Sequence, residues 1–338
     1  MPSDRYARQA ALAVIGPAGQ QRLAASTVLV VGCGALGSTQ AELCARAGVG
    51  SLVLVDRDIV ELSNLHRQSL FTEQDVHDRL PKAAAAERRL REINSEIEIE
   101  GLVVDLTAAN VVELIRRADV VLDGTDNFET RYLLNDASVR EGKPWVYGGV
   151  LGTEGLVLPV DPGTGPCLRC VFPEPPDGRG LPTCETLGVL NAAVAWVAAL
   201  QVVEALRRLT GAPPAPPELR ALDVWRGWVS SVKAPRAEDC PCCGQRRFEF
   251  LEQGRGSSST VLCGRNAVQV TPEKPGALDL EQLAAGLRPL GTVAMTGLVL
   301  DFEVAGRRLV VFPDGRVLVM GTTDPAEART LVARYIGS

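Results

Sequence analysis

A glycine-rich turn between a predicted strand and a predicted helix is the feature that most constrains this sequence. Residues 27–31 (TVLVV) form an apolar, β-branched run typical of a buried parallel strand, and the turn that follows holds Gly32, Gly34 and Gly37. Glycines at this G-x-G-x-x-G spacing let the backbone approach a phosphate, whose charge the next helix N-terminus favours. Asp56 ends the next predicted strand, where a carboxylate can bind ribose hydroxyls. The pattern favours a nucleotide site over the alternative, close helix–strand packing without a ligand.

Strand-like and helical segments alternate along the first half of the chain. The strand-like runs span residues 27–31, 52–55, 97–104, 120–122, 145–150 and 155–160, and the helical stretches span 38–47, 81–93 and 111–117. Such alternation predicts a doubly wound, Rossmann-like α/β fold. The long apolar stretch at 189–203 predicts a further helix, which we expect to be buried.

The length of 338 residues suggests about two domains. Segments rich in Pro, Gly or Ser predict breaks at 172–182, 211–218 and 253–260. We expect a first domain over 1–250, with a nucleotide-binding part at about 1–150 and a second part at about 151–250. A small α+β domain is expected over 258–338, and Asp324 is expected to cap its final helix.

Composition excludes several classes of protein. The net charge of −6 provides no electrostatic footprint for nucleic acid, and no basic stretch suggests a membrane surface. No uninterrupted apolar run reaches about 18 residues, so no membrane-spanning helix is expected. The first ten residues lack the apolar core of a signal peptide, which predicts a cytoplasmic protein.

Charged residues after the glycine turn favour a triphosphate over NAD. The chain has only two histidines, and no second half resembling a dehydrogenase substrate domain follows. Arg and Lys can offset charge on a leaving pyrophosphate, and a carboxylate can hold Mg²⁺ between phosphate oxygens. No P-loop motif is present. The candidates are Arg8, Arg67, Lys82 and Asp126, although each alone could be an ordinary surface charge or turn residue.

Nine cysteines would be unusual as disulfides in the cytoplasm. Two C-x-x-C pairs, Cys167 with Cys170 and Cys240 with Cys243, can together form a closed tetrahedral Zn²⁺ site, which is structural because four thiolates leave no open position. Cys242 is then spare. Cys184 follows a loop rich in Pro and Gly and could be a nucleophile or an incidental cysteine. The remaining cysteines are expected to be small packing residues: Cys33, Cys44 and Cys263.

Taken together, the order of these motifs resembles the ThiF/MoeB/HesA family, bacterial relatives of ubiquitin-activating enzymes. The resemblance covers about residues 1–250 and is carried by RYARQ at 5–9, GCGALG, DRD at 56–58, SNLHRQ at 63–68, Lys82, DGTDN at 123–127 and both C-x-x-C pairs. The tail resembles that of a ThiF subgroup with an appended C-terminal domain, through VLCGRN at 261–266, FPDGR at 312–316 and ARYIG at 333–337.

The resemblance implies a role for each matching residue. The glycines would lie along ATP, Asp56 would bind the ribose, and Asp126 would organise Mg²⁺. Arg8 would act on the triphosphate, in the neighbouring subunit of a homodimer. Cys184 matches a crossover-loop cysteine that in some members bonds covalently to the carrier. The implied nucleotide contacts are Gly32, Gly34, Ala35, Gly37, Asp56, Asp58, Asn64, Arg67, Lys82, Asp126 and Asn127, with Ala35 standing where relatives often have Gly.

The activity implied by the resemblance is adenylation of a ubiquitin-like sulfur-carrier protein at its C-terminal Gly-Gly. ATP supplies the adenylyl group, pyrophosphate leaves, and the acyl adenylate then accepts sulfur from a donor such as a cysteine desulfurase. The tail favours a ThiS-like carrier and thiamine thiazole synthesis. Alternatives are a MoaD-like carrier for molybdopterin synthesis, a shared activator of several carriers, an NAD-dependent oxidoreductase, and a non-catalytic zinc-stapled binding module.

Overall fold

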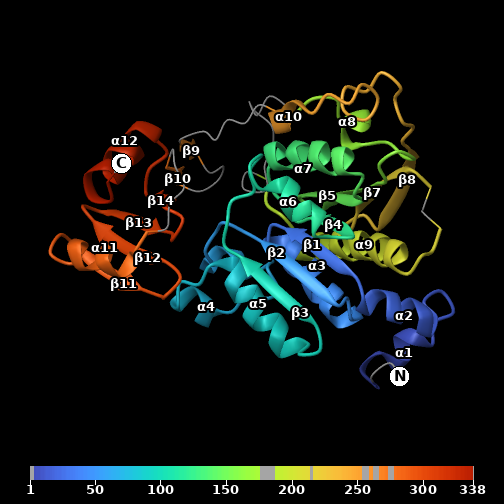
Figure 1. Cartoon of the computed structure of the whole chain (residues 1–338), viewed down its shortest axis with the longest axis horizontal. Coiled ribbons are helices and arrows are strands. Elements are labelled where there is room, and N and C mark those ends of the chain that lie inside the picture. Colours follow the sequence, from blue (N-terminus) through green and yellow to red (C-terminus); the bar gives the residue numbers. More distant parts are fainter. Residues whose placement is uncertain are drawn as a thin grey trace. The chain divides into compact units, whose positions relative to one another are not determined.

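A computed structural model describes residues 4–175, 187–213, 216–252, 259–261, 266–272 and 278–337 (Figure 1). The chain divides into two compact units. The larger unit comprises residues up to 76 and from 82 to 254, and the smaller comprises 255–338 together with the short segment His77–Pro81. None of the helices in the described ranges has the length and apolarity needed to cross a bilayer.

The larger unit is built on one eight-stranded sheet with the order β3-β2-β1-β4-β5-β6-β7-β8. The strands are β1 Thr27–Val31, β2 Ser51–Val55, β3 Glu98–Leu102, β4 Val120–Asp123, β5 Trp145–Leu151, β6 Glu154–Val160, β7 Glu218–Asp223 and β8 Trp228–Lys233. From β3 to β5 the neighbours are parallel, and β6, β7 and β8 are added antiparallel. The predicted doubly wound, Rossmann-like fold is confirmed, with its glycine turn at the carboxyl end of the central strand β1.

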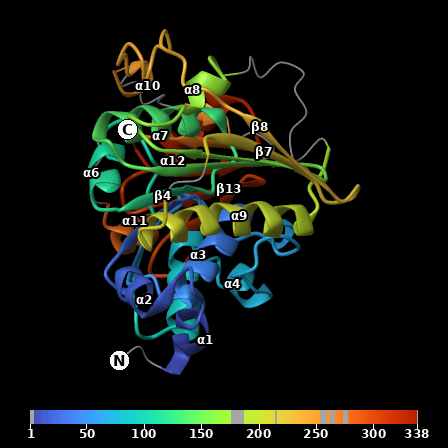
Figure 2. The same ribbon diagram turned by 90° about the vertical axis from the view of Figure 1, so that its right-hand side faces the viewer.

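Helices cover both faces of this sheet. The helices in this part of the chain are η1 Asp4–Tyr6, α1 Ala7–Ala10, α2 Gly16–Ala24, α3 Ala35–Ala47, η2 Leu62–Asn64, α4 Glu73–His77, α5 Lys82–Ile93, α6 Val111–Arg116, α7 Phe128–Glu141, α8 Leu168–Val171, α9 Asn191–Leu209 and α10 Glu249–Glu252. Figure 2 shows α3 and α9 on one face and α7 on the other. Strand residues alternate between the faces, so that Leu29, Val31 and Val121 point toward the core shared with α6 and α7.

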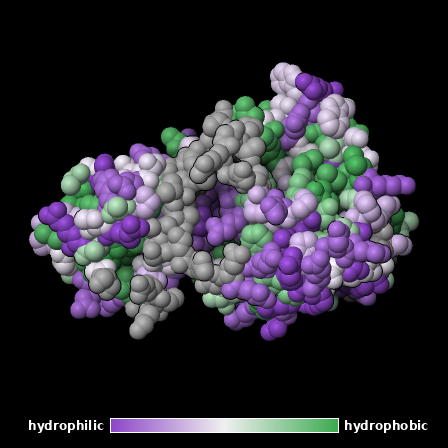
Figure 3. All heavy atoms as spheres, turned by 90° about the horizontal axis from the view of Figure 1, so that it is seen from above, coloured by the Kyte–Doolittle hydropathy of each residue, from purple (hydrophilic) through white to green (hydrophobic). Residues whose placement is uncertain are grey.

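The helix α9 is only partly buried, which corrects the expectation from its composition. Ala193, Val197 and Gln201 are buried, whereas Trp196 is 38% exposed and Val203 is 49% exposed. The apolar run had suggested burial on all sides. In the structure one face of the helix packs on α3 and the sheet, while the other remains uncovered by the described residues. Figure 3, which shows the molecule from above, has hydrophilic and apolar side chains intermingled over the face that it draws.

The smaller unit is an antiparallel sheet packed against two helices. Its strands follow the order β11-β12-β13-β14-β10-β9. They are β9 Ser259–Val261, β10 Ala267–Val270, β11 Thr292–Met295, β12 Leu300–Val304, β13 Arg307–Val311 and β14 Val317–Met320, with helices α11 Leu280–Leu287 and α12 Pro325–Tyr335. Asp324 caps α12, as predicted, by accepting a hydrogen bond from the Ala326 amide at 2.8 Å. Core residues of both helices pack on one face of the sheet.

Candidate nucleotide site and metal centre

Close packing of glycines shapes the turn after β1. Gly32 has φ +86°, a conformation that side chains rarely adopt. A Cβ at Gly37 would overlap the Gly32 carbonyl oxygen, and one at Gly124 would overlap the same atom. Gly34 is different, because a Cβ there would lie 3.8 Å from its nearest neighbour and φ is not positive. Packing therefore accounts for Gly32 and Gly37, whereas at Gly34 the packing leaves room for a Cβ.

The helix α3 begins at this turn without a side-chain cap. Gly34 is its N-cap, and Ala35 is the first helical residue. The first amides of a helix lack intrahelical acceptors and carry a partial positive charge. Their position at the carboxyl end of β1, in a doubly wound sheet, is where such folds bind phosphate groups.

Asp56 links the turn to the second strand. Its carboxylate accepts hydrogen bonds from the Cys33 amide and the Asp58 amide, both at 2.7 Å. Burial raises the pKa of Asp56, and nearby Lys82 opposes that shift. The carboxylate is thus fixed directly beside the glycine turn, at the position where the sequence pattern predicts a group that binds ribose hydroxyls.

The position of Lys82 is energetically unfavourable for a charged amine. Its side chain is 3% exposed, and its Nζ lies 3.2 Å from the Asp58 carboxylate. It is also the first residue of α5, where the helix dipole disfavours a cation. Because the fold buries an ammonium at the N-terminal end of a helix, where the dipole is unfavourable to it, Lys82 is a candidate for binding phosphate groups.

Three further predicted nucleotide contacts make local hydrogen bonds in the structure. Asn64 is 3% exposed, and its side-chain oxygen accepts from the Glu61 amide at 3.2 Å. Arg67 donates to the Ser63 carbonyl oxygen at 2.8 Å and is half-buried. Asn127 caps α7 by accepting from the Thr130 amide at 2.8 Å, so its local role is structural.

The loop after β4 carries Asp126 above a buried ion pair that sequence reasoning missed. Asp126 is exposed. Beneath it, Arg131 Nε lies 3.2 Å from the fully buried Asp123 carboxylate, and Arg131 also donates to the Thr125 and Gly148 carbonyl oxygens at 2.7 and 3.1 Å. The available signal was the i, i+8 spacing of an acid at the strand end and an arginine in the next helix.

Two glutamines tie the helices of one face to this strand end. Gln40 of α3 and Gln201 of α9 each donate to the Asp123 carbonyl oxygen at 2.9 Å, and Gln40 also donates to Gln201 at 2.6 Å. The loop bearing Asp126 therefore starts from a strand end that is fixed on both faces of the sheet.

Arg8 lies apart from this group within the chain. Its neighbour Gln9 donates to the Ala47 carbonyl oxygen at 2.7 Å, and Arg5 donates to the Ile93 carbonyl oxygen at 3.0 Å. These are the last residues of α3 and α5, whereas the candidate site lies where the same helices begin. The thirteen residues of α3 span about 18 Å. The backbone around Arg8 is therefore anchored near the far end of this helix, away from the glycine turn.

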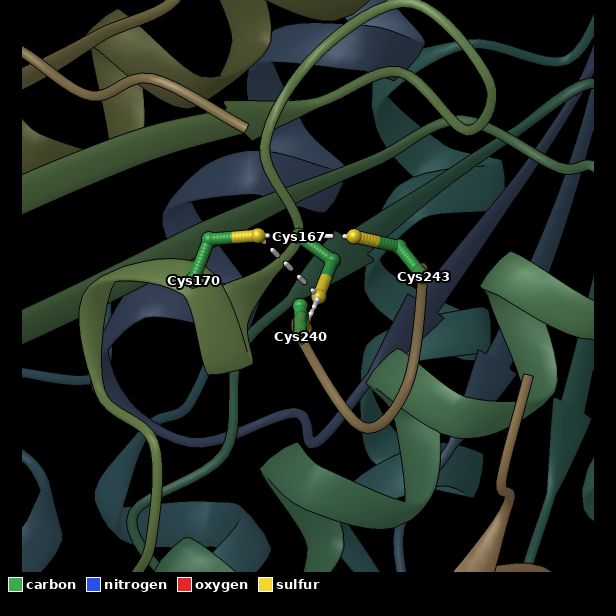
Figure 4. A group of neighbouring side chains, drawn as sticks. All are labelled: Cys167, Cys170, Cys240 and Cys243. Atoms are coloured by element: carbon green, nitrogen blue, oxygen red, sulfur yellow. Dashed lines mark hydrogen bonds between the residues drawn. The ribbon is translucent and has the colours of Figure 1, made fainter. Parts of the chain in front are cut away.

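The four cysteines of the two C-x-x-C pairs converge, as Figure 4 shows. The sulfur of Cys167 lies 3.9 Å from that of Cys170 and 3.5 Å from that of Cys240, and the Cys170–Cys243 distance is 3.4 Å. Tetrahedral zinc with bonds of about 2.3 Å separates its sulfur ligands by about 3.8 Å. All four atoms lie within 4.8 Å of one another, so the donor set and spacing fit such an ion.

The other described cysteines are not members of this four-cysteine cluster. Cys242 is buried and turned toward α7, where its sulfur accepts from the Asn135 amide group at 3.2 Å. Asn135 in turn accepts from the Leu168 amide at 2.8 Å, which links α7 to the segment of the first pair. Cys33 and Cys44 are buried, and burial raises the pKa of Cys44 to about 12, as suits a packing residue. The remaining two lie outside the described residues: Cys184 and Cys263.

Comparison with known proteins decides the family. The ThiF family model matches residues 6–242. The chain belongs to the ThiF family. It is 46% identical over 338 residues, which cover 99% of this chain and 100% of the relative, to the sulfur carrier protein ThiS adenylyltransferase of Bacillus subtilis. It is 41% identical to the sulfur carrier protein adenylyltransferase of Thermus thermophilus, over 71% of this chain and 90% of that one. The resemblance inferred from the motifs is thereby confirmed.

A solved structure supports the fold of this ThiF-family chain. The crystal structure of Escherichia coli MccB superposes with a TM-score of 0.63, covering 71% of this chain and 72% of that one at 22% identity. At this identity the match concerns the fold alone.

Proposed function

We propose that this ThiF-family chain adenylates the C-terminal carboxylate of a ThiS-like sulfur carrier, for sulfur transfer in thiamine thiazole synthesis. The observation that carries the proposal is the 46% identity to the ThiS adenylyltransferase of Bacillus subtilis over the whole chain. That similarity extends through the smaller unit, beyond the residues matched by the family model. The chain is accordingly an adenylyltransferase, and the residue roles below are our assignments.

The reaction is displacement at the α-phosphorus of ATP. A carboxylate oxygen of the carrier's terminal glycine forms the new bond to phosphorus, and the bond to the pyrophosphate oxygen breaks. No general base is needed, because a terminal carboxyl group is already ionised near pH 7. Catalysis then consists of positioning the reactants and stabilising the charge that develops on pyrophosphate.

The site offers a group for each of these tasks. The free amides at the start of α3 and the open backbone at Gly34 suit the phosphate chain. Asp56 is placed for the ribose, and the buried Lys82 ammonium for the leaving pyrophosphate. Asn64 and Arg67 lie in the segment 61–68 and are assigned as further contacts to the nucleotide.

Asp126 is the residue assigned to Mg²⁺. It is an exposed carboxylate at the end of the loop after β4, and Mg²⁺ is bound in proteins by one or two carboxylates plus substrate phosphates. When bound, the ion would neutralise charge on the phosphate oxygens. Asp126 would thus provide an oxygen ligand on a loop whose base is held by Asp123.

The cysteine cluster is assigned to structural Zn²⁺. It joins segments 73 residues apart in the sequence, and four thiolates leave no position for a substrate. Its contribution is to hold the segments of the two C-x-x-C pairs together. Cys184 as a covalent attachment point for the carrier stays a prediction.

The exposed edge strand of the large sheet is suited to binding a protein partner. All six residues of β8 are exposed, and they include Trp228, Val229 and Val232. An edge strand with unpaired backbone groups and apolar side chains is a common site for binding another chain. We propose that the carrier binds along this edge. A cytoplasmic homodimer and a cysteine desulfurase as sulfur donor are further parts of the proposal.

Carrier-dependent exchange of pyrophosphate into ATP tests the proposal. ThiS-like and MoaD-like carriers should be compared with and without their terminal Gly-Gly. We expect exchange only with the intact ThiS-like carrier. Preference for the MoaD-like protein would move the chain to molybdopterin synthesis, and equal use would indicate a shared activator. No exchange from folded, metal-loaded protein would contradict adenylation and favour a binding module, whereas NADH binding without Mg²⁺ would favour an oxidoreductase.

Variants at two positions test the assigned roles in the same assay. Lys82→Ala and Asp126→Ala should each lower exchange by about 100-fold or more while the fold is retained. Glu113→Ala is the matched control for Asp126, because Glu113 is an exposed acid on α6. Full activity in either site variant would reject the corresponding role.

A further inference from the structure

One buried side chain of α7, Asn135, contacts both of the segments that carry the clustered cysteines. Its amide oxygen accepts a hydrogen bond from the Leu168 backbone amide at 2.8 Å, and its amide nitrogen donates to the Cys242 sulfur at 3.2 Å. Leu168 lies inside the first C-x-x-C pair, and Cys242 lies inside the second. A single amide group of α7 therefore joins the two halves of the cysteine cluster.

The two partners fix the orientation of this amide group. A backbone N–H can only donate, so the Leu168 amide must meet the oxygen of Asn135 and not its nitrogen. The nitrogen then faces the Cys242 sulfur, which can accept a hydrogen bond. The contact to each segment therefore uses a different end of the side chain, and an apolar residue at this position could make neither contact.

The place of Asn135 in the helix is unusual for an asparagine. The residue is 0% exposed and lies in the middle of α7, although asparagine is a poor former of helix interiors. Burying an amide group costs free energy unless its polar atoms are hydrogen-bonded. Because the two cysteine-bearing segments supply those hydrogen bonds, the side chain is suited to holding them together.

Neighbouring residues of α7 hold the same two segments beyond the cysteines. The Tyr132 hydroxyl donates to the Phe172 carbonyl oxygen at 2.8 Å, after the first pair. After the second pair, the Asp136 carboxylate accepts from the Phe250 amide at 2.9 Å, and the Phe250 ring lies 5.0 Å from that of Tyr132. None of these contacts passes through a metal ion, so α7 can arrange the two segments before an ion binds.

We propose that Asn135 is a positioning residue for the metal centre. By holding Leu168 and Cys242 against α7, it keeps the sulfurs of the two C-x-x-C pairs close enough for one ion to bind all four. A site arranged in advance binds its ion more tightly, because less of the chain has to be ordered on binding. This inference rests on the proposed assignment of the cluster to zinc.

The zinc affinity of the full-length chain tests the inference, measured by competition with a colorimetric zinc chelator. Asn135→Leu keeps the approximate volume of the side chain but removes both hydrogen bonds. Because residues that orient metal ligands typically change metal affinity by about 10–100-fold, this variant should raise the zinc dissociation constant by that factor. Melting curves verify that each variant is folded.

Ser138→Ala is the matched control for Asn135→Leu. Ser138 is equally buried on the same helix, and its hydroxyl has no hydrogen-bond partner among the described residues. Removing it therefore alters a buried polar group of α7 without breaking a contact to either cysteine-bearing segment. The zinc affinity of this variant should equal that of the wild type.

Two substitutions of Cys242 separate the hydrogen bond from packing. Cys242→Ala removes the acceptor of the Asn135 amide group and should weaken zinc binding. Cys242→Ser supplies a hydroxyl oxygen as a replacement acceptor and should keep most of the affinity. Neither substitution changes α7, so this pair tests the inference even if Asn135→Leu does not fold.

Hydrogen exchange of the metal-free chain provides a readout that needs neither metal nor activity. The Leu168 amide should exchange slowly in the wild type, because Asn135 accepts its hydrogen, and several-fold faster in Asn135→Leu. The Thr130 amide, which Asn127 caps at the start of the same helix, should exchange equally fast in both and serves as the internal reference.

The outcomes separate this inference from the proposed function. A wild-type chain that binds no zinc, but whose Leu168 amide loses protection in Asn135→Leu, would reject the zinc assignment and retain the positioning of the two segments. The expected zinc affinities in a chain without pyrophosphate exchange would reject adenylation and support the inference.

Three results would overturn the inference. The first is a zinc-binding wild type whose affinity is unchanged in Asn135→Leu. The second is an equal loss of affinity in Ser138→Ala, which would indicate a general loosening of α7. The third is equal zinc affinity of Cys242→Ala and Cys242→Ser, which would show that the hydrogen bond to position 242 has no effect on the metal centre.

Discussion

Removing Arg131 should leave an unpaired charge in the interior of the larger unit. The Asp123 carboxylate is fully buried, and its distance of 3.2 Å from Arg131 Nε corresponds to about 5 kcal/mol of attraction at an effective dielectric constant of about 20. Breaking a buried pair by removing one partner typically costs about 3–5 kcal/mol. We therefore expect Arg131→Met to lose about 4 kcal/mol of unfolding free energy at about pH 8.

The loss should depend on pH in a defined direction. Burial already raises the pKa of Asp123, an effect that Arg131 opposes. In the variant that pKa rises further, so Asp123 takes up a proton at a higher pH than in the unfolded chain. A neutral carboxyl group needs no cation, and the difference between variant and wild type should shrink as the pH falls toward 5.

Urea unfolding at a series of pH values measures this difference. The matched control is Arg140→Met on the same helix, because Arg140 pairs with Glu141 at the surface and should cost no more than about 0.5 kcal/mol. The double variant Arg131→Met/Asp123→Asn removes both charges and should be more stable than Arg131→Met alone. A loss below about 1 kcal/mol for Arg131→Met, or one that stays constant between pH 8 and 5, would refute the reasoning.

Three other experiments test separate features. Gly37→Ala should destabilise the fold by about 3 kcal/mol or more and abolish exchange, since its Cβ would meet a backbone carbonyl; a normal melting curve would contradict this. Cys243→Ser should lose bound zinc and lower the melting temperature, whereas Cys242→Ser should keep its zinc, as metal analysis would establish. If Arg8 serves the neighbouring protomer, an equal mixture of the Arg8→Ala and Lys82→Ala variants should regain about a quarter of wild-type exchange. Half of the dimers in that mixture are mixed dimers, and each carries one complete site. No regain of exchange would reject that arrangement.

The sequence contained enough local information to predict the fold around the candidate nucleotide site. The β-branched run of β1 and the glycine spacing gave the strand, the turn and the following helix, although α3 begins at Ala35 rather than at residue 38. Asp56 could be placed because the carboxyl ends of adjacent parallel strands meet at one edge of a sheet. In these cases a local rule and the global fold agree.

Other features could not be predicted because they arise from contacts distant in sequence. The helix α7 was not predicted, since its many polar residues hide its burial, and only the Asn127 cap signals its start. The pairing of Asp123 with Arg131 depends on how that helix lies on the sheet.

The cysteine cluster has a consequence for the order of events during synthesis. Its first pair emerges from the ribosome 73 residues before its second, which at about 5–20 residues per second amounts to several seconds. During that interval Cys167 and Cys170 form only half a site. The metal can therefore be captured fully only after α9, β7 and β8 have been made, so zinc uptake would report the completion of this sheet in a nascent chain.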